Sequence, residues 1–301
     1  MRVAVLMSTY NGENYLADQI ESILSQQGDF TLSLLVRDDG SADGTARILS
    51  RYAEAGSLSW YQGENRKPAK SFLTLLRDNP GYDFYAFSDQ DDLWDPDKLA
   101  VAISRLKDIA APGVYCANAR LVKSDLAPIG KNIFDCAVAC DFYSRVCSDG
   151  VPGCTMVLNS ALAQLVQGVP MPESVIMHDT YLLALCAAFD GTVIFDPAPH
   201  MAYRQHCLNA VGVKYTKLSA LRDRWHRITK KEPVSIAQQA QSLLLLYPDI
   251  PDENKRAFLA RVAGYRETPF RALSLALSRK PRYNSINMGL TIRLSLAFRK
   301  R

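Results

Sequence analysis

Hydrophobic and polar positions alternate between two periods along the first hundred residues. Apolar runs rich in β-branched and aromatic residues predict strands at 3–8, 32–37, 58–61 and 84–87. Between these runs, apolar residues at helical spacing predict a helix within 13–27 and another that contains Ile48 and Leu49. Asp43 is a candidate N-cap for the second helix. Strands that alternate with helices predict an α/β fold with a mostly parallel sheet covered on both faces.

The pattern changes along the rest of the chain. Residues 98–212 continue as mixed α/β, with a predicted strand at 113–117 and a predicted helix near 179–188. Beyond Lys214 the segments 215–230, 234–247, 252–265 and 269–279 predict helices punctuated by prolines. From Ile286 to Phe298 apolar residues alternate as in a strand, but the flanking composition favours a helix, which we predict. The chain therefore divides into an α/β region, 1–212, and a mainly helical region, 213–301.

Charge divides the chain at the same place. Residues 214–301 contain 19 Lys and Arg against 6 Asp and Glu, whereas the remaining 213 residues contain 16 against 25. An acidic body with a basic C-terminal region indicates two different tasks. No run of 18 apolar residues predicts a membrane span, and the apolar run at the start is too short for a signal peptide. We therefore predict a cytoplasmic protein.

Cysteine usage agrees with a reducing compartment. The cysteines are Cys116, Cys136, Cys140, Cys147, Cys154, Cys186 and Cys207. Their odd number excludes a fully paired disulfide framework, and no CxxC spacing indicates a zinc site.

The stretch SDQDDLWDPDKL at 88–99 carries the most informative chemistry. A predicted strand delivers Asp89, Asp91 and Asp92 into a loop at its carboxyl end. Three carboxylates within four residues repel one another unless a cation lies among them. Hard oxygen ligands on a short loop suit Mg²⁺ or Mn²⁺. The alternative is a solvated acidic turn that caps a helix beginning near Asp95 and Pro96.

Three further stretches are candidates for a site. VRDDGSADGT at 36–45 is a strand followed by two carboxylates and a glycine-containing turn, which suits a ligand at the strand end. His178 and Asp179 open a predicted helix, although an acidic residue in a first turn is also a common dipole partner. YRQHCLN at 203–209 places His206 beside Arg204, although a single histidine is more often structural. Neither GxGxxG nor a Walker phosphate loop occurs, which argues against a dinucleotide fold and a P-loop.

Together and in this order, these stretches resemble glycosyltransferase family 2. The opening LMSTYNGENYLADQIESILSQ is similar to the family's first strand and helix, and DDGSADGT to its nucleotide-binding turn. DQD at 89–91 matches its DxD motif, and His178-Asp179 stands where the family has a Glu/His-Asp pair. The resemblance covers 1–212 and implies a GT-A fold, a Rossmann-like, mostly parallel sheet flanked by helices. It implies a nucleotide-sugar half at about 1–110 and an acceptor half at about 111–212.

Finer detail is similar to one subgroup, the bacterial rhamnosyltransferases that use dTDP-L-rhamnose in the synthesis of O-antigen and other cell-surface polysaccharides. The stretches that carry this likeness are NRKPAKSFLTLL, FSDQDDLWDPDKL, GCTMVLN and YRQHCLNAVG. Two departures stand out. Cys207 follows the YRQH motif where the subgroup often has glycine, and Arg66 and Lys67 replace small residues and would alter donor or acceptor contacts.

The resemblance implies a role for each matching residue on the donor side. The nucleotide-sugar-binding residues would be Thr9, Tyr10, Asn11, Glu13, Asp39, Lys70, Asp89, Gln90 and Asp91. Asp39 would accept a hydrogen bond from N3–H of the pyrimidine, and Asp89 would contact the ribose side. Asp91 would bind Mg²⁺ or Mn²⁺ directly, with His206 as a second ligand, and the metal would neutralise the diphosphate leaving group.

Asp179 would be the general base on the acceptor side. It would take the proton of an acceptor hydroxyl, and one inverting displacement would turn a β-linked donor into an α-L-rhamnoside. His178 would orient the base or the acceptor, and Arg204 would add a positive charge at the diphosphate. Residues that would wall the acceptor side are Trp94, Gly153, Cys154 and Thr155, although Trp94 suits the core equally well.

Several alternatives remain at this stage. The basic C-terminal region, rich in interleaved apolar residues, suits an anionic membrane surface at which a lipid-linked glycan acceptor would be met. It suits equally a set of helices that packs on the catalytic domain or on a second subunit of a homodimer. No nucleic-acid recognition motif accompanies the charge. The rival functions are a family 2 transferase with a UDP-sugar donor, a sugar nucleotidyltransferase, a phosphohydrolase and a degenerate nucleotide-sugar-binding module.

Overall fold

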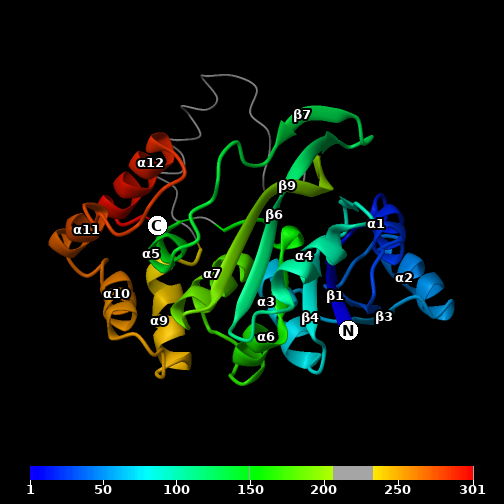
Figure 1. Cartoon of the computed structure of the whole chain (residues 1–301), viewed down its shortest axis with the longest axis horizontal. Coiled ribbons are helices and arrows are strands. Elements are labelled where there is room, and N and C mark those ends of the chain that lie inside the picture. The colour runs from blue at the N-terminus through cyan, green and yellow to red at the C-terminus, as the bar shows by residue number, and fades with distance from the viewer. Residues whose placement is uncertain (149, 206–232, 301) are drawn as a thin grey trace.

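The computed structural model describes residues 1–148, 150–205 and 233–300 (Figure 1). In chain order, its elements are β1 Arg2–Thr9, α1 Leu16–Leu24, β2 Thr31–Asp38, α2 Thr45–Glu54, β3 Ser59–Gln62, α3 Lys67–Asp78, β4 Phe84–Ser88, β5 Leu93–Trp94, α4 Lys98–Leu106, β6 Gly113–Lys123, β7 Pro128–Asn132, α5 Phe142–Cys147, the 3₁₀ turn η1 Gly153–Thr155, β8 Val157–Asn159, α6 Ser160–Gln167, α7 His178–Ala188, β9 Thr192–Gln205, α9 Ile236–Leu246, α10 Glu253–Ala263, α11 Pro269–Ala276 and α12 Ile286–Ala297.

One mixed sheet forms the centre of the molecule. Its order is β3-β2-β1-β4-β8-β6-β9-β5, with β7 paired to β6. β1 runs parallel to β2 and β4, and β2 runs parallel to β3, so these four strands end at one edge of the sheet. β8 lies antiparallel to both β4 and β6, while β6 and β9 are parallel. The shared edge is where an open α/β sheet binds its ligands.

Strand β1 shows how the sheet acquires two cores. Val3, Val5 and Met7 are fully buried against α1, α2 and α4 on one face. The alternate residues Ala4 and Leu6 are buried on the opposite face, against α3, α6 and α7. A strand covered on both faces is apolar throughout, which explains the continuous run in its sequence. Figure 1 shows the helices on both sides of the sheet.

Most predicted elements are present, and the departures have local causes. The predicted strand at 113–117 is the first part of the longer β6, and the ambiguous C-terminal stretch is a helix, α12. The N-cap of α2 is Gly44, one residue after the predicted Asp43, whose Oδ1 still accepts a hydrogen bond from the Thr45 N–H at 3.0 Å. Strand β9 was not predicted, because its Pro- and Asp-containing first half lacks the strand pattern. The predicted helix at 215–230 lies outside the described residues.

The C-terminal helices α9 to α12 pack on the α/β part of the chain. Tyr247, Phe258 and Tyr265 are buried in the same apolar cluster as α3 and α7. A boundary at 212/213 therefore stays a prediction, since the described helices beyond it share a core with those before it. None of the described helices combines the length and apolar composition needed to cross a bilayer.

Candidate functional site

The region predicted to bind the donor contains Asp38, the last residue of β2. This buried carboxylate accepts hydrogen bonds from the Thr9 hydroxyl at 2.9 Å and from the Ser41 N–H at 2.9 Å. It thereby joins the carboxyl ends of β1 and β2 and fixes the turn that follows. Sequence reasoning chose Asp39 and missed Asp38, although both belong to the same DDGS stretch. Thr9 is buried and supports the turn, and its predicted place in the nucleoside pocket stays a prediction.

A second set of hydrogen bonds completes this turn. Asn11 Oδ1 accepts from the Ala42 N–H at 2.9 Å, and Glu13 Oε2 accepts from the Gly44 N–H at 2.6 Å. The Gly12 N–H donates to Thr45 Oγ1 at 2.8 Å. The predicted residues Asn11 and Glu13 thus hold the loop after β1 against the loop after β2. We refer to residues 9–13 and 38–45 together as the donor turn.

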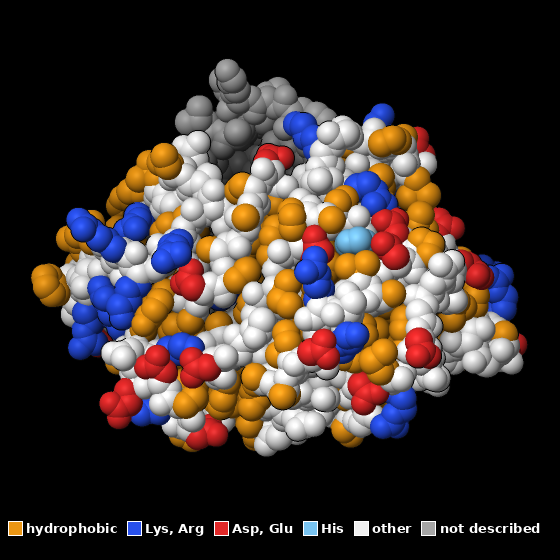
Figure 2. Space-filling model, in the orientation of Figure 1, with side chains coloured by type: hydrophobic (Ala, Val, Ile, Leu, Met, Phe, Trp, Pro, Cys, Tyr) orange, Lys and Arg blue, Asp and Glu red, His pale blue; other side chains and the backbone are white. Residues whose placement is uncertain are grey.

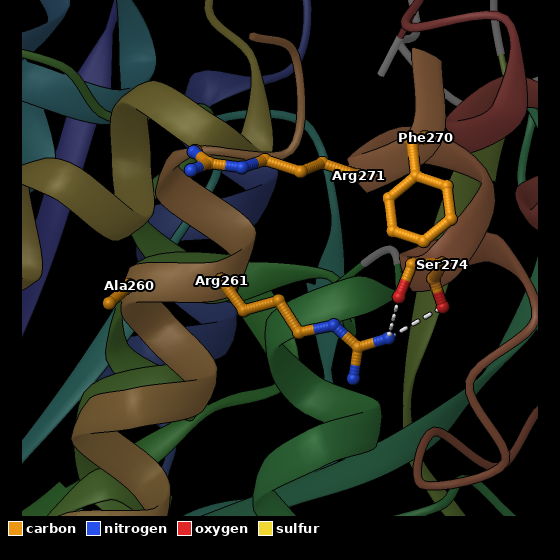
Figure 3. Close-up of a pocket in the computed structure, with 6 residues that line it drawn as sticks. Ala260, Arg261, Phe270, Arg271 and Ser274 are labelled. Carbon is orange, nitrogen blue, oxygen red and sulfur yellow. Dashed lines mark hydrogen bonds between the residues drawn. The ribbon is translucent and has the colours of Figure 1, made fainter. Parts of the chain in front are cut away.

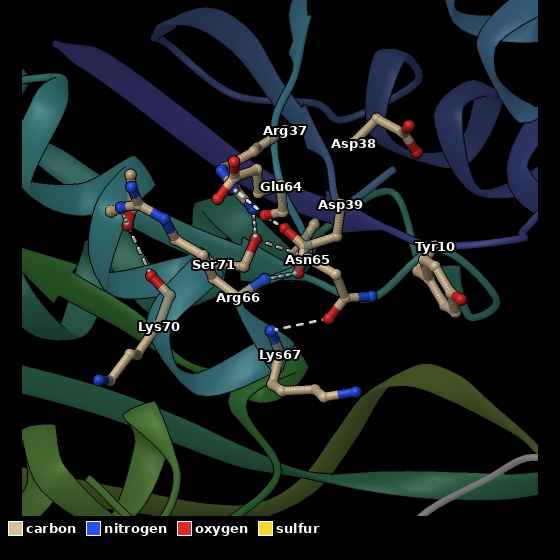
Figure 4. A network of polar contacts seen from close by, with 12 residues as sticks. Tyr10, Arg37, Asp38, Asp39, Glu64, Asn65, Arg66, Lys67, Lys70 and Ser71 are labelled. Carbon is tan, nitrogen blue, oxygen red and sulfur yellow. Dashed lines mark hydrogen bonds and ion pairs between the residues drawn. The ribbon is translucent and has the colours of Figure 1, made fainter. Parts of the chain in front are cut away.

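Asp39 lies at the centre of a buried polar network (Figure 4). It is 3% exposed, forms an ion pair with Arg37 and accepts a hydrogen bond from the Arg66 N–H at 2.9 Å. Burial lowers the pKa of Arg37. The backbone at Lys67 has a φ of 64°, in the left-handed region that glycine adopts most readily. In Figure 4 the side chains of Lys67 and Lys70 extend away from the network.

The acidic loop after β4 is tied to the donor turn by Gln90. Its side-chain amide accepts a hydrogen bond from the Tyr10 N–H at 2.8 Å and donates to the Tyr10 carbonyl at 3.0 Å. The ring of Tyr10 itself is half exposed. Gln90 thus fixes the backbone at Tyr10, and its role in binding the donor stays a prediction.

Arg204 holds the other side of the acidic loop. The guanidinium of Arg204 donates to the Asp91 carbonyl at 2.8 Å and to the Asp18 carboxylate at 3.1 Å. The backbone N–H of Arg204 donates to the Asp92 carboxylate at 3.2 Å. The guanidinium is buried and lies over the Tyr15 ring. These contacts hold the acidic loop in place, and the predicted role of Arg204 as a positive charge at the diphosphate stays a prediction. His206 lies outside the described residues.

The carboxylates of this loop crowd one another. Burial, followed by repulsion from Asp91, raises the pKa of Asp89 to about 7, and Asp179 adds to the repulsion. Burial, followed by repulsion from Asp91 and Asp89, raises the pKa of Asp92 well above its usual range. Lys98, which is 2% exposed, has a pKa lowered by burial to about 8, and its Nζ lies 3.6 Å from the centre of the Trp94 ring. A cation among these carboxylates would relieve their repulsion.

These crowded carboxylates can be compared with the ligands that a divalent metal requires. Oxygen ligands suit Mg²⁺ and Mn²⁺, and ligand atoms of Asp89, Asp92 and Cys154 lie within 4.8 Å of one another. Burial raises the pKa of the Cys154 thiol well above its usual range, so the protonated sulfur is a poor ligand for these hard cations. Asp91, the predicted direct ligand, is not in this group of three but is half buried in the same loop. The carboxylates of the loop therefore fit a metal, and Cys154 does not.

His178 and Asp179 begin α7 close to the acidic loop. The His178 ring lies between Phe72 and Phe87, with ring centres 4.2 and 4.9 Å away. Its two nitrogens make no hydrogen bond within the described part of the chain, and burial lowers its pKa to about 3, so the ring is neutral. Asp179 is 8% exposed and accepts hydrogen bonds from the N–H and hydroxyl of Thr180.

Glycines allow this close packing around α7. A Cβ on Gly153 would clash with the His178 ring, and one on Gly150 would lie 2.6 Å from Asp179 Oδ1. Cys154 and Thr155 are fully buried. The three residues of η1 are thus buried beside the start of α7, and their predicted place on the acceptor side stays a prediction.

Trp94 belongs to the core, the second of the two alternatives for this residue, since it is 3% exposed and pairs with Met201. Sequence reasoning missed Gly150 and Lys98. Lys98 lies in the stretch SDQDDLWDPDKL at 88–99, but the sequence does not indicate that this lysine side chain is buried.

Comparison with known proteins agrees with this geometry. Residues 4–162 match the model of glycosyl transferase family 2, and the chain belongs to this family. It is 30% identical over 253 residues to the dTDP-rhamnosyl transferase RfbG of Shigella flexneri, covering 77% of this chain and 83% of that protein.

Solved structures share the fold at low sequence identity. TarS 1–349 of S. aureus in complex with UDP-GlcNAc is 16% identical, with a TM-score of 0.54, over 99% of this chain and 92% of that one. The mannosyltransferase PcManGT of Pyrobaculum calidifontis, in complex with GDP-Man and Mn²⁺, is 19% identical, with a TM-score of 0.51, over 99% and 86%. The mixed, mostly parallel sheet with flanking helices is thus a GT-A-like fold, as predicted.

Proposed function

We propose that this protein transfers L-rhamnose from dTDP-β-L-rhamnose to a hydroxyl group of a lipid-linked glycan, with inversion, at the cytoplasmic face of the membrane. The observation that carries the transferase chemistry is the convergence of two carboxylate sites. Ligand atoms of Asp89 and Cys154 lie within 4.8 Å of each other, and Gly153, next to Cys154, packs against the His178 ring, so the acidic loop lies beside the start of α7. The choice of rhamnose is supported by the similarity to RfbG, which spans both halves of the catalytic region.

The proposed reaction is a single displacement. Asp179 accepts the proton of the acceptor hydroxyl while that oxygen forms its bond to the anomeric carbon and the bond to the diphosphate breaks. Asp89 and Asp91 would hold Mg²⁺ or Mn²⁺, which supplies Lewis acidity to the leaving diphosphate. The neutral His178 ring fixes the first turn of α7, and with it the direction of Asp179. Asp39 and Tyr10 are proposed to face the pyrimidine nucleoside.

A surface hollow in the acceptor half suits the glycan. A cavity of about 600 Å³ is lined by the β6–β7 hairpin and the loop after it, with polar side chains from Asn118, Lys131, Asn132 and Asp135. Its size and polarity match a sugar unit better than an apolar ligand. Lys131→Ala should raise the acceptor KM while the donor KM stays unchanged. A rise in the donor KM alone would contradict this assignment.

Donor turnover tests the function as a whole. Purified protein with Mn²⁺ or Mg²⁺ would be offered dTDP-rhamnose, UDP-glucose, UDP-N-acetylglucosamine and GDP-mannose, and released nucleoside diphosphate would be measured with and without a lipid-linked acceptor. We expect metal-dependent release from dTDP-rhamnose. Release from a UDP-sugar alone would keep the transferase and overturn the choice of rhamnose. The absence of both release and binding would favour a degenerate binding module.

A further inference from the structure

The helices α11 and α12 expose large apolar side chains on their outer face. These are Phe270, Leu273, Leu277, Ile286, Leu290 and Phe298, each at least half exposed, with Phe270 at 81% and Ile286 at 92%. The opposite sides of the same helices are anchored in the core by Ala272, Leu275, Ile292 and Leu296. Positions 270, 273 and 277 share one side of α11 by helical spacing. The exposure is therefore a property of two firmly packed helices, and we call this surface the outer face.

Positive charge surrounds the outer face. Residues 266–300 contain eight Lys and Arg and a single acidic residue, Glu267, which is paired with Arg271. Exposed basic residues in this segment are Arg271, Arg279, Lys280, Arg282, Arg299 and Lys300. Figure 2 shows basic side chains gathered at this end of the molecule, with apolar side chains along its margin. Apolar anchors among basic side chains are the pattern of a surface that lies on anionic lipid.

A cavity beside the outer face adds a place for a headgroup. It has a volume of about 300 Å³, lies between α10 and α11, and is lined by Arg261, Arg271, Phe270 and Ser274 (Figure 3). Arg261 donates to the carbonyl and hydroxyl of Ser274, which holds its guanidinium at the cavity. Guanidinium groups bind phosphate oxygens in two-bond geometry. The cavity is therefore suited to a phosphate group at the level of the exposed Phe270.

We propose that the outer face docks this protein on an anionic phospholipid surface, with a lipid phosphate in the cavity between α10 and α11. Pairing of two such faces in a symmetric dimer would bring like charges together, which favours lipid over a second copy. The α11–α12 pair is fastened to the acceptor half, where the Arg282 N–H donates to Ser144 and the Ala139 N–H donates to Asn284. Docking would thus bring the acceptor side to the membrane, which deepens the proposed use of a lipid-linked acceptor.

Vesicle flotation tests the docking surface without using catalysis. The full chain would be mixed with vesicles of phosphatidylcholine alone or of phosphatidylcholine with phosphatidylglycerol. We expect strong binding only to the anionic vesicles, weakened by high salt. Phe270→Ser with Ile286→Ser should reduce that binding by at least about tenfold. Arg261→Gln and Arg271→Gln should each reduce it by about fivefold.

Matched control variants distinguish binding through the outer face from nonspecific binding to vesicles. Leu245→Ser removes an apolar side chain that is 71% exposed on α9, and Arg105→Gln removes an exposed charge on α4. Both should bind as the wild type does, and all variants should release nucleoside diphosphate at the wild-type rate. Equal binding to both kinds of vesicle, or loss of binding in the Leu245 variant alone, would overturn the proposal. So would the absence of vesicle binding together with a dimer, seen by light scattering, that Ile286→Ser abolishes.

Because flotation requires no donor, an inactive protein that binds anionic vesicles would refute only the proposed reaction. An active protein that does not bind anionic vesicles would refute only the proposed docking.

Discussion

The donor turn and the region around α7 are adjacent but differ in how their polar groups are satisfied. In the donor turn, Asp38, Asn11 and Glu13 each accept hydrogen bonds from neighbouring backbone or hydroxyl groups. Around α7 and the acidic loop, Lys98 Nζ and both His178 nitrogens are buried and make no hydrogen bond to any described residue. These polar groups of the donor turn are hydrogen-bonded without a ligand. The unsatisfied buried groups around α7 and the acidic loop lower the stability of the folded state.

The difference indicates that the region around α7 is less stable than it could be, because its polar groups are placed for the proposed reaction. A hydrogen-bonded turn would present its backbone to the proposed nucleotide with little reorganisation, which favours binding. Burial and mutual repulsion raise the pKa values of Asp89 and Asp92, and burial lowers that of Lys98, as happens at reactive sites. We therefore expect substitutions in the two regions to affect different quantities, and the following predictions run from the largest effect to the smallest.

Asp179→Asn should reduce turnover by about 10²- to 10⁴-fold, since it removes the proposed base and keeps the shape of the side chain. Donor binding, measured by calorimetry with dTDP, should stay unchanged because the donor turn is not touched. Asp108→Asn, an exposed position after α4, is the matched control. Turnover of the Asp179 variant close to the wild-type value would show that another group takes the proton.

Lys98→Met should lower the free energy of unfolding by about 3–5 kcal/mol, because it leaves the buried Asp92 without the cation that attracts it. The double variant with Asp92→Asn should recover part of this loss. Lys107→Met, at an exposed position, should change stability by about 0.5 kcal/mol or less. Denaturant unfolding gives all three values. A small loss for Lys98→Met would indicate that Asp92 is already protonated in the folded state.

The buried His178 should make the folded state sensitive to acid. Its pKa is about 3 in the folded protein and 6.5 in an exposed chain, so below pH 6.5 only the unfolded state takes up the proton. The stability of the wild type relative to His178→Leu should therefore fall, as pH decreases from about 6 toward 4, by up to about 1.4 kcal/mol per pH unit. The raised pKa values of Asp89 and Asp92 act in the opposite direction in both proteins and cancel in the difference. A difference that does not vary with pH would show that the ring is protonated in the folded protein.

Lys67→Gly should raise the free energy of unfolding by up to about 1 kcal/mol, because glycine adopts the left-handed backbone of this position without strain. Lys70→Gly, inside α3, should lower it by about the same amount. Thermal unfolding of the two variants would show the opposite signs. If both were destabilising, the contacts of the Lys67 side chain would outweigh the relief of strain.

The sequence predicted β1 to β4, the first part of β6, the acidic loop and the pair at 178–179, because each has a local signature, whereas β5, β7, β8 and β9 were not predicted. Strand β1 is apolar throughout, and the three carboxylates lie within four residues of one another. The failures concern long-range burial. Nothing near Arg204 in sequence indicates that its side chain connects the acidic loop to α1. Likewise, the His178 ring packs against a glycine 25 residues earlier along the chain. Asp38 and Asp39 could not be distinguished, because the direction of each side chain depends on the end of β1.

The double hydrogen bond between the Gln90 amide and the Tyr10 backbone also has a thermodynamic meaning. It joins the loop proposed to hold the metal to the turn proposed to hold the nucleotide, across 80 positions of sequence. Whatever orders one loop lowers the entropy that remains to be lost by the other, so metal and nucleotide should bind with positive cooperativity. Linkage makes that effect reciprocal, and each ligand should raise the affinity of the other by the same factor. In Gln90→Ala both ligands would still bind, but the factor that couples them would approach one.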